Sequence, residues 1–534
     1  MISPYYINLM GKYGNRMQDY SNLPDLLSHM DRLGIWQTTA TCLRGNVRES
    51  NRALLADLEK TPGAKERIIP AFLAEPHIYV SSGEMEHLTM CLQEYSPACI
   101  RLQPTIGQYR LREMEQVLLR LEEFHPVILL DKREMTDIAD IDDLIYLAKR
   151  FPTMRFVVQQ IFWSRLHYVF DAMQRADNIF IDTGWLQNEQ GIAILCKHLG
   201  EDHVLFSLSY RANHGAAIAG LCYAEISQQQ KDNIASENFI NLFHSEHDRA
   251  ILRARRRSIP NRVANSYWNR FIEEKPLGVR VIDSHTHISP HLGQWFAPQN
   301  DMAEATPPFR KKMERLGIEL SIISQPGRWH EDPRQPNSDL LEVTKDHTDC
   351  MKGYLTFIPD SCHLYTREYL DKMFATGFFI GFKSMPEYYM VSICDERYDM
   401  MFRYAQEHDL PILLHSGGVH GDIRLCGEAV AKWPGVKLIL GHSGGADPGR
   451  QTCHEVAQNP KYDGLYFEFC GSFMSRISWK ESLNYIDYHR FLFGTDANLH
   501  DAAWELGRLL SEDICDEQLE AILGGNAIRL FGLA

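Results

Sequence analysis

The sequence predicts two tandem (β/α)8 TIM-barrel-like domains of the α/β class, of which the first is degenerate. Three observations predict this fold: the chain length, an internal repeat, and the alternation of short apolar strands with longer amphipathic helical stretches. The chain has 534 residues, which favours two domains of about 250 residues each over a single core. We expect the domains at residues 1–243 and 279–534, joined by a charged connector at 244–278.

Four pairs of matching segments indicate the repeat. Residues 147–160 (LAKRFPTMRFVVQQ) align without gaps to 429–442 (AVAKWPGVKLILGH). The other pairs are 178–184 with 464–471, 203–210 with 490–497, and 233–243 with 521–531. Because the pairs keep the same order and similar spacing, an internal duplication explains them better than shared composition does.

Eight apolar strands are predicted in the second half, at 279–288, 319–325, 353–359, 379–385, 411–417, 437–443, 465–471 and 491–497. Eight strand–helix units over about 255 residues fit a (β/α)8 barrel. An open doubly wound sheet is the competing architecture. Polar residues at the C-terminal end of nearly every strand favour the barrel, because barrel active sites lie at that end.

Composition narrows the class of protein. The formal net charge of -15 argues against nucleic-acid and anionic-membrane partners. No apolar run reaches the roughly 18 residues that span a bilayer, and the first residues lack the pattern of a secretory signal. The 12 cysteines are scattered, as reduced and mostly buried thiols are. We therefore expect a cytoplasmic protein that acts on a small molecule.

The strongest local motif is Asp283-Ser284-His285-Thr286-His287, which follows an apolar run. Side chains alternate across a strand, so His285 and His287 share one face. In a barrel strand that face is the interior, near the C-terminal mouth. Two imidazoles so spaced can hold one divalent metal at about 2.0–2.1 Å.

Three further polar residues end later strands. His415 follows PILL, His442 follows LILG, and Asp496 follows LFGT. A single histidine at a strand end is usually structural. Four histidines and an aspartate, each at the end of a strand in one half, predict a metal site.

The second half also resembles a known protein family in five segments: IDSHTHI, PILLHSGG, VKLILGHSGG, FLFGTDA and ILGGNAIRLFGL. Residues 279–534 resemble the amidohydrolase superfamily, within it the amidohydrolase-related branch that includes aminocarboxymuconate semialdehyde decarboxylase. The resemblance implies one divalent ion held by His285, His287, His415 and Asp496, with His442 as a catalytic group beside it. Zinc fits three nitrogen ligands and a carboxylate best; Mn²⁺, Fe²⁺ and Co²⁺ fit almost as well.

These parts predict a metal-dependent hydrolase acting on a small amide, lactone or ester through a metal-activated water. Asp496 would take the proton of the water, and His442 would stabilise the developing oxyanion. The alternative is a metal-dependent non-oxidative decarboxylase, a lyase. A second alternative is a non-catalytic binding protein that contains a metal.

Two more residues are candidate substrate contacts. Lys383 lies in the predicted fourth strand, where it would contact a substrate anion, bridge two metals as a carboxylated lysine, or form a structural salt bridge. Arg328 follows the second strand, at the face where barrel loops carry function.

The first half lacks the ligands. In the alignment, His442 faces Gln160, Asp496 faces Ser209, and Lys383 faces Arg101, while His415 falls near Leu130 and Asp131, and His285 and His287 fall on Asn8 and Met10. Such residues do not supply several deprotonated ligands to one ion. We expect this half to act as an internal pseudo-subunit in a protein that forms homo-oligomers; a separate ligand-binding domain is the alternative.

Overall fold

The computed structural model describes residues 5–14, 20–81, 83–131, 138–161, 166–288, 301–325, 332–471 and 475–534. The chain forms two compact units, Met1–Val263 and Ala264–Ala534. Their boundary falls within 244–278, the segment predicted as a connector. Its first part forms helix α13 (Glu246–Arg255) of the first unit, and its second part forms α14 (Tyr267–Ile272) of the second.

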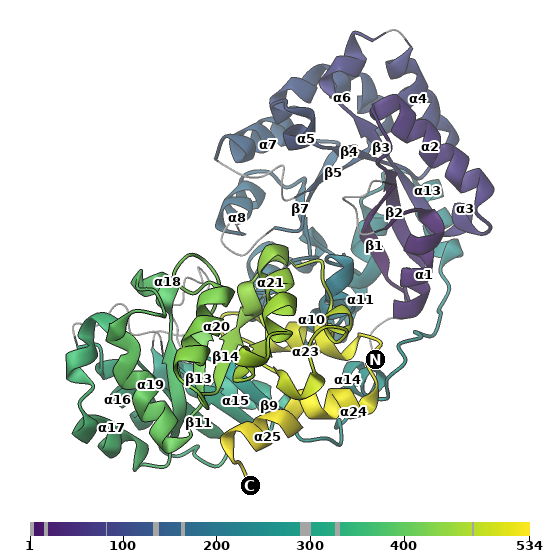
Figure 1. Ribbon diagram of the computed structural model, residues 1–534. Helices are drawn as coiled ribbons and strands as arrows, with labels where there is room; N and C mark the ends of the chain where they lie inside the picture. Colours follow the sequence, from purple (N-terminus) through teal and green to yellow (C-terminus); the bar gives the residue numbers. More distant parts are fainter. Residues whose placement is uncertain are drawn as a thin grey trace. The chain divides into compact units, whose positions relative to one another are not determined.

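Each unit contains one eight-stranded parallel sheet whose strands pair in chain order, as a (β/α)8 barrel requires. Helices alternate with the strands in both (Figure 1). The first sheet consists of β1 (Ile7–Tyr13), β2 (Gln37–Cys42), β3 (Ile68–Ala74), β4 (Cys99–Leu102), β5 (Val127–Asp131), β6 (Arg155–Gln159), β7 (Ile179–Asp182) and β8 (Val204–Leu205). The second consists of β9 (Ile282–Thr286), β10 (Leu320–Ile323), β11 (Met351–Thr356), β12 (Phe379–Ser384), β13 (Ile412–His415), β14 (Leu438–Gly441), β15 (Leu465–Glu468) and β16 (Phe491–Leu492).

The longer helices follow the strands. In the first unit they are α1 (Leu23–Leu33), α2 (Val47–Lys60), α4 (Glu84–Glu94), α6 (Glu115–Leu121), α7 (Ile138–Arg150), α8 (Leu166–Arg175), α9 (Gly191–Leu199) and α10 (Ala216–Tyr223). In the second they are α15 (Met302–Leu316), α16 (Gln335–Thr344), α17 (Arg367–Phe374), α19 (Asp399–His408), α20 (Ile423–Lys432), α21 (Asp447–Ala457) and α23 (Ala502–Leu510). The predicted tandem (β/α)8 architecture is confirmed.

The second barrel is closed by backbone hydrogen bonds between its first and last strands. The amide of Ser284 donates to Phe493 O at 3.0 Å, and that of Asp496 donates to His285 O at 2.7 Å. In the first unit, the matching hydrogen bond goes to a side chain: Leu208 N donates to Asn8 Oδ1 at 2.9 Å. The first barrel is therefore the more open of the two.

The same capping chemistry delimits the first long helix of each unit. α1 begins after Asn22, whose side chain accepts from Asp25 N, and α15 begins after Asp301 in the same way. α1 ends at Gly34 and α15 at Gly317, with φ angles of 76° and 74°. Glycine adopts this left-handed conformation without steric cost, so it ends both helices.

Matching contacts confirm the internal repeat in three dimensions. Each unit carries a single π-helical turn near its end, at Asn233–Glu237 and at Ala521–Gly525, the segments that the sequence alignment pairs. Asn238 and Asn526 follow these turns directly. Asn238 Nδ2 donates to the carbonyl of Val204, and Asn526 Nδ2 donates to that of Phe491, at the starts of β8 and β16.

The pairing of Lys383 with Arg101 is also confirmed. Asn51 makes two hydrogen bonds to the backbone of Leu73, and Asn337 makes the same two to Thr356. Leu73 lies beside Arg101 in the sheet, and Thr356 lies beside Lys383.

The alignment of the first strands differs from the prediction. Asn8 Oδ1 accepts from the amide two residues later and from Leu208 N; Asp283 Oδ1 accepts from the amide two residues later and from Thr495 N. Asn8 is therefore the counterpart of Asp283, not of His285.

The predicted pairing was wrong by two positions, and Met10 and Lys12 stand where His285 and His287 stand. The first strands share too few residues to fix their register from sequence. The first half still lacks the ligands after this shift, because a methionine and a lysine do not replace the two imidazoles of His285 and His287.

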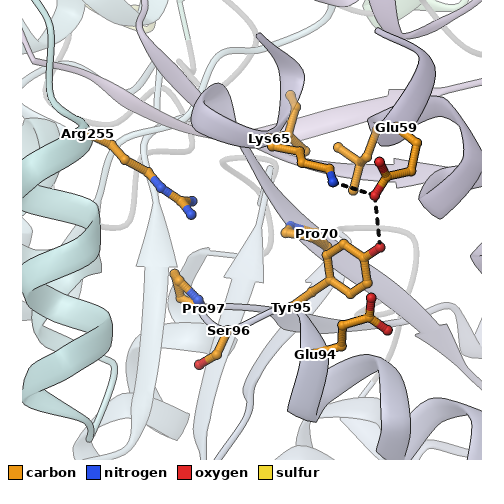
Figure 2. Close-up of a pocket in the computed structure, with 10 residues that line it drawn as sticks. Glu59, Lys65, Pro70, Glu94, Tyr95, Ser96, Pro97 and Arg255 are labelled. Atoms are coloured by element: carbon orange, nitrogen blue, oxygen red, sulfur yellow. Dashed lines mark hydrogen bonds and ion pairs between the residues drawn. The ribbon is translucent and has the colours of Figure 1, made fainter. Parts of the chain in front are cut away.

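A cavity of about 250 Å³ opens in the first unit where β3 and β4 begin (Figure 2). Its rim carries Glu59, Lys65, Glu94 and Arg255. Lys65 Nζ lies 2.5 Å from Glu59 Oε1. The strands begin at this end, whereas barrel active sites form where strands end, so this cavity is not the counterpart of the predicted site.

Two further features concern the cysteines and the helices. All 12 cysteines are free, and most of them are buried. Among the described residues, no helix has the length and apolar character needed to cross a membrane.

Candidate metal centre

The site is built where β9 ends. Strand alternation turns His285 into the barrel, and His287 follows one residue beyond the strand. The two rings lie 5.4 Å apart, centroid to centroid. Asp496 reaches them from the segment after β16: its Oδ1 lies 3.0 Å from His287 Nε2 and 3.7 Å from His285 Nε2. All three side chains are buried.

Hydrogen bonds from the far side of each ring assign the tautomers. His287 Nδ1 lies 2.9 Å from the carbonyl oxygen of Ser324, and His285 Nδ1 lies 2.9 Å from Glu468 Oε2. A carbonyl oxygen accepts only, and so does the carboxylate of Glu468 when it is ionised, so each histidine donates from Nδ1. Each Nε2 therefore lies towards Asp496: that of His285 presents a lone pair, and that of His287 is within hydrogen-bond distance of Asp496 Oδ1, at 3.0 Å.

This donor set fits a divalent cation. Two nitrogen lone pairs that face a carboxylate repel it unless a cation or a proton lies between them. The separations of 3.0 and 3.7 Å bracket the ligand-to-ligand distance of about 3.3 Å that bonds of about 2.0–2.1 Å give around a tetrahedral ion. Ligand atoms of His285, His287 and Asp496 all lie within 4.8 Å of one another.

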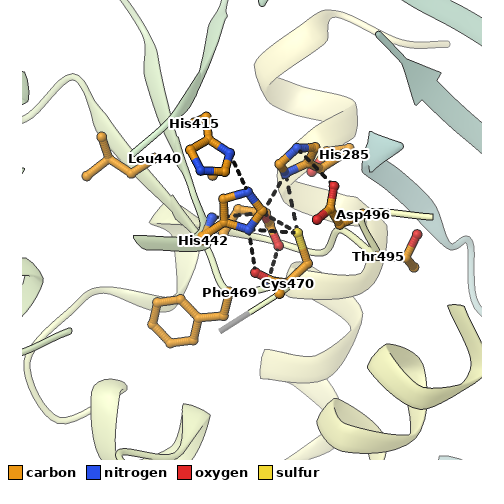
Figure 3. Close-up of polar contacts among 12 residues, drawn as sticks. His285, His415, Leu440, His442, Phe469, Cys470, Thr495 and Asp496 are labelled. Carbon is orange, nitrogen blue, oxygen red and sulfur yellow. Dashed lines mark hydrogen bonds and ion pairs between the residues drawn. The ribbon is translucent and has the colours of Figure 1, made fainter. Parts of the chain in front are cut away.

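His415 and His442 form a second pair beside this group (Figure 3). His442 Nδ1 donates to the carbonyl oxygen of Cys470 at 2.8 Å, so its Nε2 accepts from His415 Nδ1, 3.0 Å away. The remaining lone pair of His415 is then on Nε2, the atom a fourth ligand would use. The structure thus places His415 in direct contact with His442, and the rings of His442 and His285 lie 5.0 Å apart.

The ionisation states suit metal ligation. Burial, reinforced by the charge of Lys383, holds the pKa of His285 well below its usual value, and burial lowers the pKa of His415 and His442 as well. Burial alone would raise the pKa of Asp496, but hydrogen bonds from His287 and His500 bring it well below its usual value. Neutral imidazoles and an ionised carboxylate are the forms that bind a divalent ion.

Lys383 extends from β12 into the same group. Its Nζ lies 2.8 Å from His285 Nε2, and the side chain is almost fully buried. Burial lowers its pKa to about 8, against the opposing charge of Asp496. Lys383 is therefore placed to contact a substrate or the metal region.

Two glycines make room for His285. A Cβ on Gly494 would lie 2.8 Å from His285 Cβ and 2.9 Å from Glu468 Cδ; one on Gly441 would lie 2.9 Å from His285 Cε1. These contacts explain why the strand-end motifs read LGH and FGTD. The backbone that follows is strained at His442 and Asp496, with φ angles of 64° and 56°.

Three residues of the site were missed from the sequence. Glu468 and Cys470 lie under His285 and His442, and His500 Nε2 lies 3.3 Å from Asp496 Oδ2. Glu468 had one signal: it is a carboxylate inside the predicted strand 465–471, and Asp182 stands at the same place in the matching segment of the first half. Cys470 and His500 had none, because one lies in an apolar run and the other in a loop.

Of the predicted contacts, Arg328 lies outside the described residues. In the part of the chain that the structure describes, clusters of three or more His, Cys, Asp or Glu side chains able to share one ion occur in the second unit alone. At the matching place in the first barrel, Arg101 donates to Thr41 Oγ1 and Gln159 Oε1. A buried hydrogen-bond network thus replaces the cluster.

Comparisons with known proteins agree with these observations. The sequence model of the amidohydrolase family matches residues 282–533, which confirms the resemblance for that stretch. A search of curated proteins finds no match.

Solved structures similar to this chain include three bacterial proteins. An uncharacterised TIM-barrel protein from Bordetella bronchiseptica is 17% identical, with a TM-score of 0.38, over 48% of this chain and 99% of that one. A putative amidohydrolase from Staphylococcus aureus is 15% identical, with a TM-score of 0.39, over 48% and 100%. The 5-carboxyvanillate decarboxylase from Sphingomonas paucimobilis is 12% identical, with a TM-score of 0.37, over 48% and 100%.

Proposed function

We propose that the second unit, an enzyme domain of the amidohydrolase superfamily, releases carbon dioxide from a small carboxylic acid with one divalent metal ion bound. His285, His287, His415 and Asp496 would hold the ion. When bound, it supplies a Lewis acid that polarises a substrate oxygen. This proposal favours the lyase over the hydrolase that the sequence first indicates.

The contact between Lys383 and His285 carries the proposal. Lys383 Nζ donates to the lone pair on His285 Nε2, 2.8 Å away, the same lone pair that would bind the ion. Once that lone pair is engaged, the buried ammonium needs another acceptor, because an unpaired buried charge is costly. A substrate carboxylate would satisfy it, whereas a neutral amide, lactone or ester would offer a weaker partner.

The other residues would complete the reaction. Lys383 would orient the carboxylate that leaves. The bond from carbon to the carboxylate breaks, its electron pair stays on the carbon, and a proton must take the place of carbon dioxide. His442, which is hydrogen-bonded to His415 beside the site, would relay that proton.

Hydrolysis of a small carbonyl compound is the second candidate, and Asp496 favours it. Its pKa lies well below the usual value because His287 and His500 outweigh the effect of burial. It is therefore ionised near neutral pH and would accept the proton of an attacking water.

A substrate panel separates the two. The full chain is loaded in turn with Zn²⁺, Mn²⁺, Fe²⁺ and Co²⁺, because manganese is bound in the structure of a similar decarboxylase. It is then incubated with aromatic acids, including 5-carboxyvanillate and 2,6-dihydroxybenzoate, named for two similar enzymes, and with esters, lactones and amides. Metal-dependent carbon dioxide release supports the lyase. Acid production from the neutral panel without carbon dioxide release would replace it with the hydrolase.

A further inference from the structure

The carboxylate of Glu468 lies underneath the candidate metal centre, on the side of His285 away from Asp496. Glu468 ends β15 and is completely buried. Its Oε2 lies 2.9 Å from His285 Nδ1 and accepts from His442 N at 3.4 Å, while its Oε1 accepts from Cys470 N. One side chain therefore connects three segments of the site.

The first barrel has an acidic residue at the position of Glu468 but no histidine at the position of His285. Asp182 ends β7, and its Oδ1 accepts from the amides of Gln160 and Gly184 at 2.8 and 3.1 Å. These amides match those of His442 and Cys470. The backbone contacts are thus common to both barrels and do not depend on a metal centre.

The contact with His285 is what the second barrel adds. Glutamate is one methylene longer than aspartate, and the extra length brings an oxygen within hydrogen-bond distance of His285 Nδ1. Asp182 has no such partner, since Met10 occupies the position of His285. The longer glutamate therefore occurs in the barrel that has the candidate metal ligands, and the shorter aspartate in the barrel that lacks them.

We propose that Glu468 is a positioning residue, whose carboxylate fixes the tautomer and ring orientation of His285 so that Nε2 faces the metal. A carboxylate accepts the Nδ1 proton and leaves the lone pair on Nε2; such partners orient histidine ligands and make them more basic. The proposal rests on the metal-dependent function above.

Cys470 closes the arrangement. Its Sγ lies 2.8 Å from Glu468 Oε2 and 3.3 Å from His285 Nδ1. The thiol donates to the carboxylate, and burial keeps its pKa well above the usual value. His285, His442, Glu468 and Cys470 also have the number and type of ligands for an ion of their own. Their hydrogen bonds satisfy one another, so the proposal assigns them to support of the site.

The test is Glu468→Asp in the full chain, because Asp182 shows that an aspartate can make the two backbone contacts. The metal-free variant should unfold at the temperature of the original protein. Its affinity for Zn²⁺ or Mn²⁺, measured by competition with a chelator, should fall roughly 10- to 100-fold. Glu512→Asp is the matched control: this buried glutamate accepts from the amides of Trp479 and Lys480, and its shortening should leave the affinity unchanged.

A second readout addresses the tautomer directly. In metal-free protein labelled with ¹⁵N histidine, the His285 signals should show Nδ1 protonated in the original chain and a mixture in Glu468→Asp. If Glu468→Asp does not fold, Glu468→Gln keeps the shape with a neutral acceptor and should give a smaller loss of affinity.

Unchanged affinity and an unchanged His285 tautomer in the folded variant would overturn the proposal. So would two ions per chain in the original protein, of which Cys470→Ser removes one. Metal binding by the original chain without release of carbon dioxide would contradict the proposed decarboxylase alone, so the two failures can be told apart.

Discussion

Lys383 Nζ and His285 Nε2 lie 2.8 Å apart in the interior of the second barrel. The ammonium group of Lys383 thus donates to the lone pair with which His285 would bind a metal ion. Removing the cation should weaken the binding of acidic substrates. Lys383→Met should lower kcat/KM for a carboxylic acid roughly 10- to 100-fold, the effect of losing one hydrogen bond to a charged group. Metal content should not fall. Lys352→Met, at the partly exposed start of β11, is the control and should behave as the original protein.

The ligand residues should differ from His442 in their effect. His287→Ala and Asp496→Asn should each bind the metal at least about 10-fold more weakly and lose turnover, because each removes one ligand. His442→Ala should keep the metal and lose roughly 100-fold in kcat, as expected for a group that acts on the transition state. Metal analysis beside steady-state kinetics checks both. Near-normal turnover in Asp496→Asn would refute the site assignment.

Gly494 should not tolerate a side chain. The new Cβ of Gly494→Ala would lie 2.8 Å from His285 Cβ, so the strand end must shift. We expect a loss of about 1–3 kcal/mol in the free energy of unfolding together with weaker metal binding. Gly525→Ala is the control, since its Cβ would meet ordinary contacts of 3.4 Å. Denaturant unfolding and a metal titration measure the two effects.

Glu505 should make the second unit less stable as pH rises. Burial raises its pKa to about 7 although Arg508 opposes this, whereas an unfolded glutamate titrates near pH 4.3. Between these values the folded state binds more protons, so stability is greatest at low pH and falls as pH rises through 7. The difference between the two pKa values corresponds to about 4 kcal/mol. Glu505→Gln should remove this dependence, which thermal unfolding at pH 5 and pH 8 would show.

Arg101 should stabilise the first unit and leave metal binding unaffected. Its guanidinium is fully buried and donates to Thr41, Gln159 and the carbonyl oxygen of Leu9. Arg101→Met leaves these acceptors without a donor and should lower the free energy of unfolding by about 2–4 kcal/mol. Arg175→Met removes a surface ion pair with Asp171 and should cost at most about 1 kcal/mol. A fall in metal affinity with Arg101→Met would contradict the division of roles.

The sequence by itself determined the fold and brought together most residues of the candidate metal centre. Apolar runs that alternate with helical stretches identify the strands, and strand alternation places His285 inside the barrel. Parallel strands of a barrel end at one face, so residues at strand ends, such as Asp496, must meet there. The sequence also aligned Gln160 with His442, because the segments that contain them, 147–160 and 429–442, match without gaps.

Only the tertiary structure decided which atoms face one another. Glu468 and His285 are 183 residues apart, and no local pattern relates them. The register of β1 likewise depended on hydrogen bonds from Asn8 to the last strand of the barrel. Local periodicity records which face of a strand is buried, whereas the proton on each histidine depends on acceptors that only the closed barrel brings into contact.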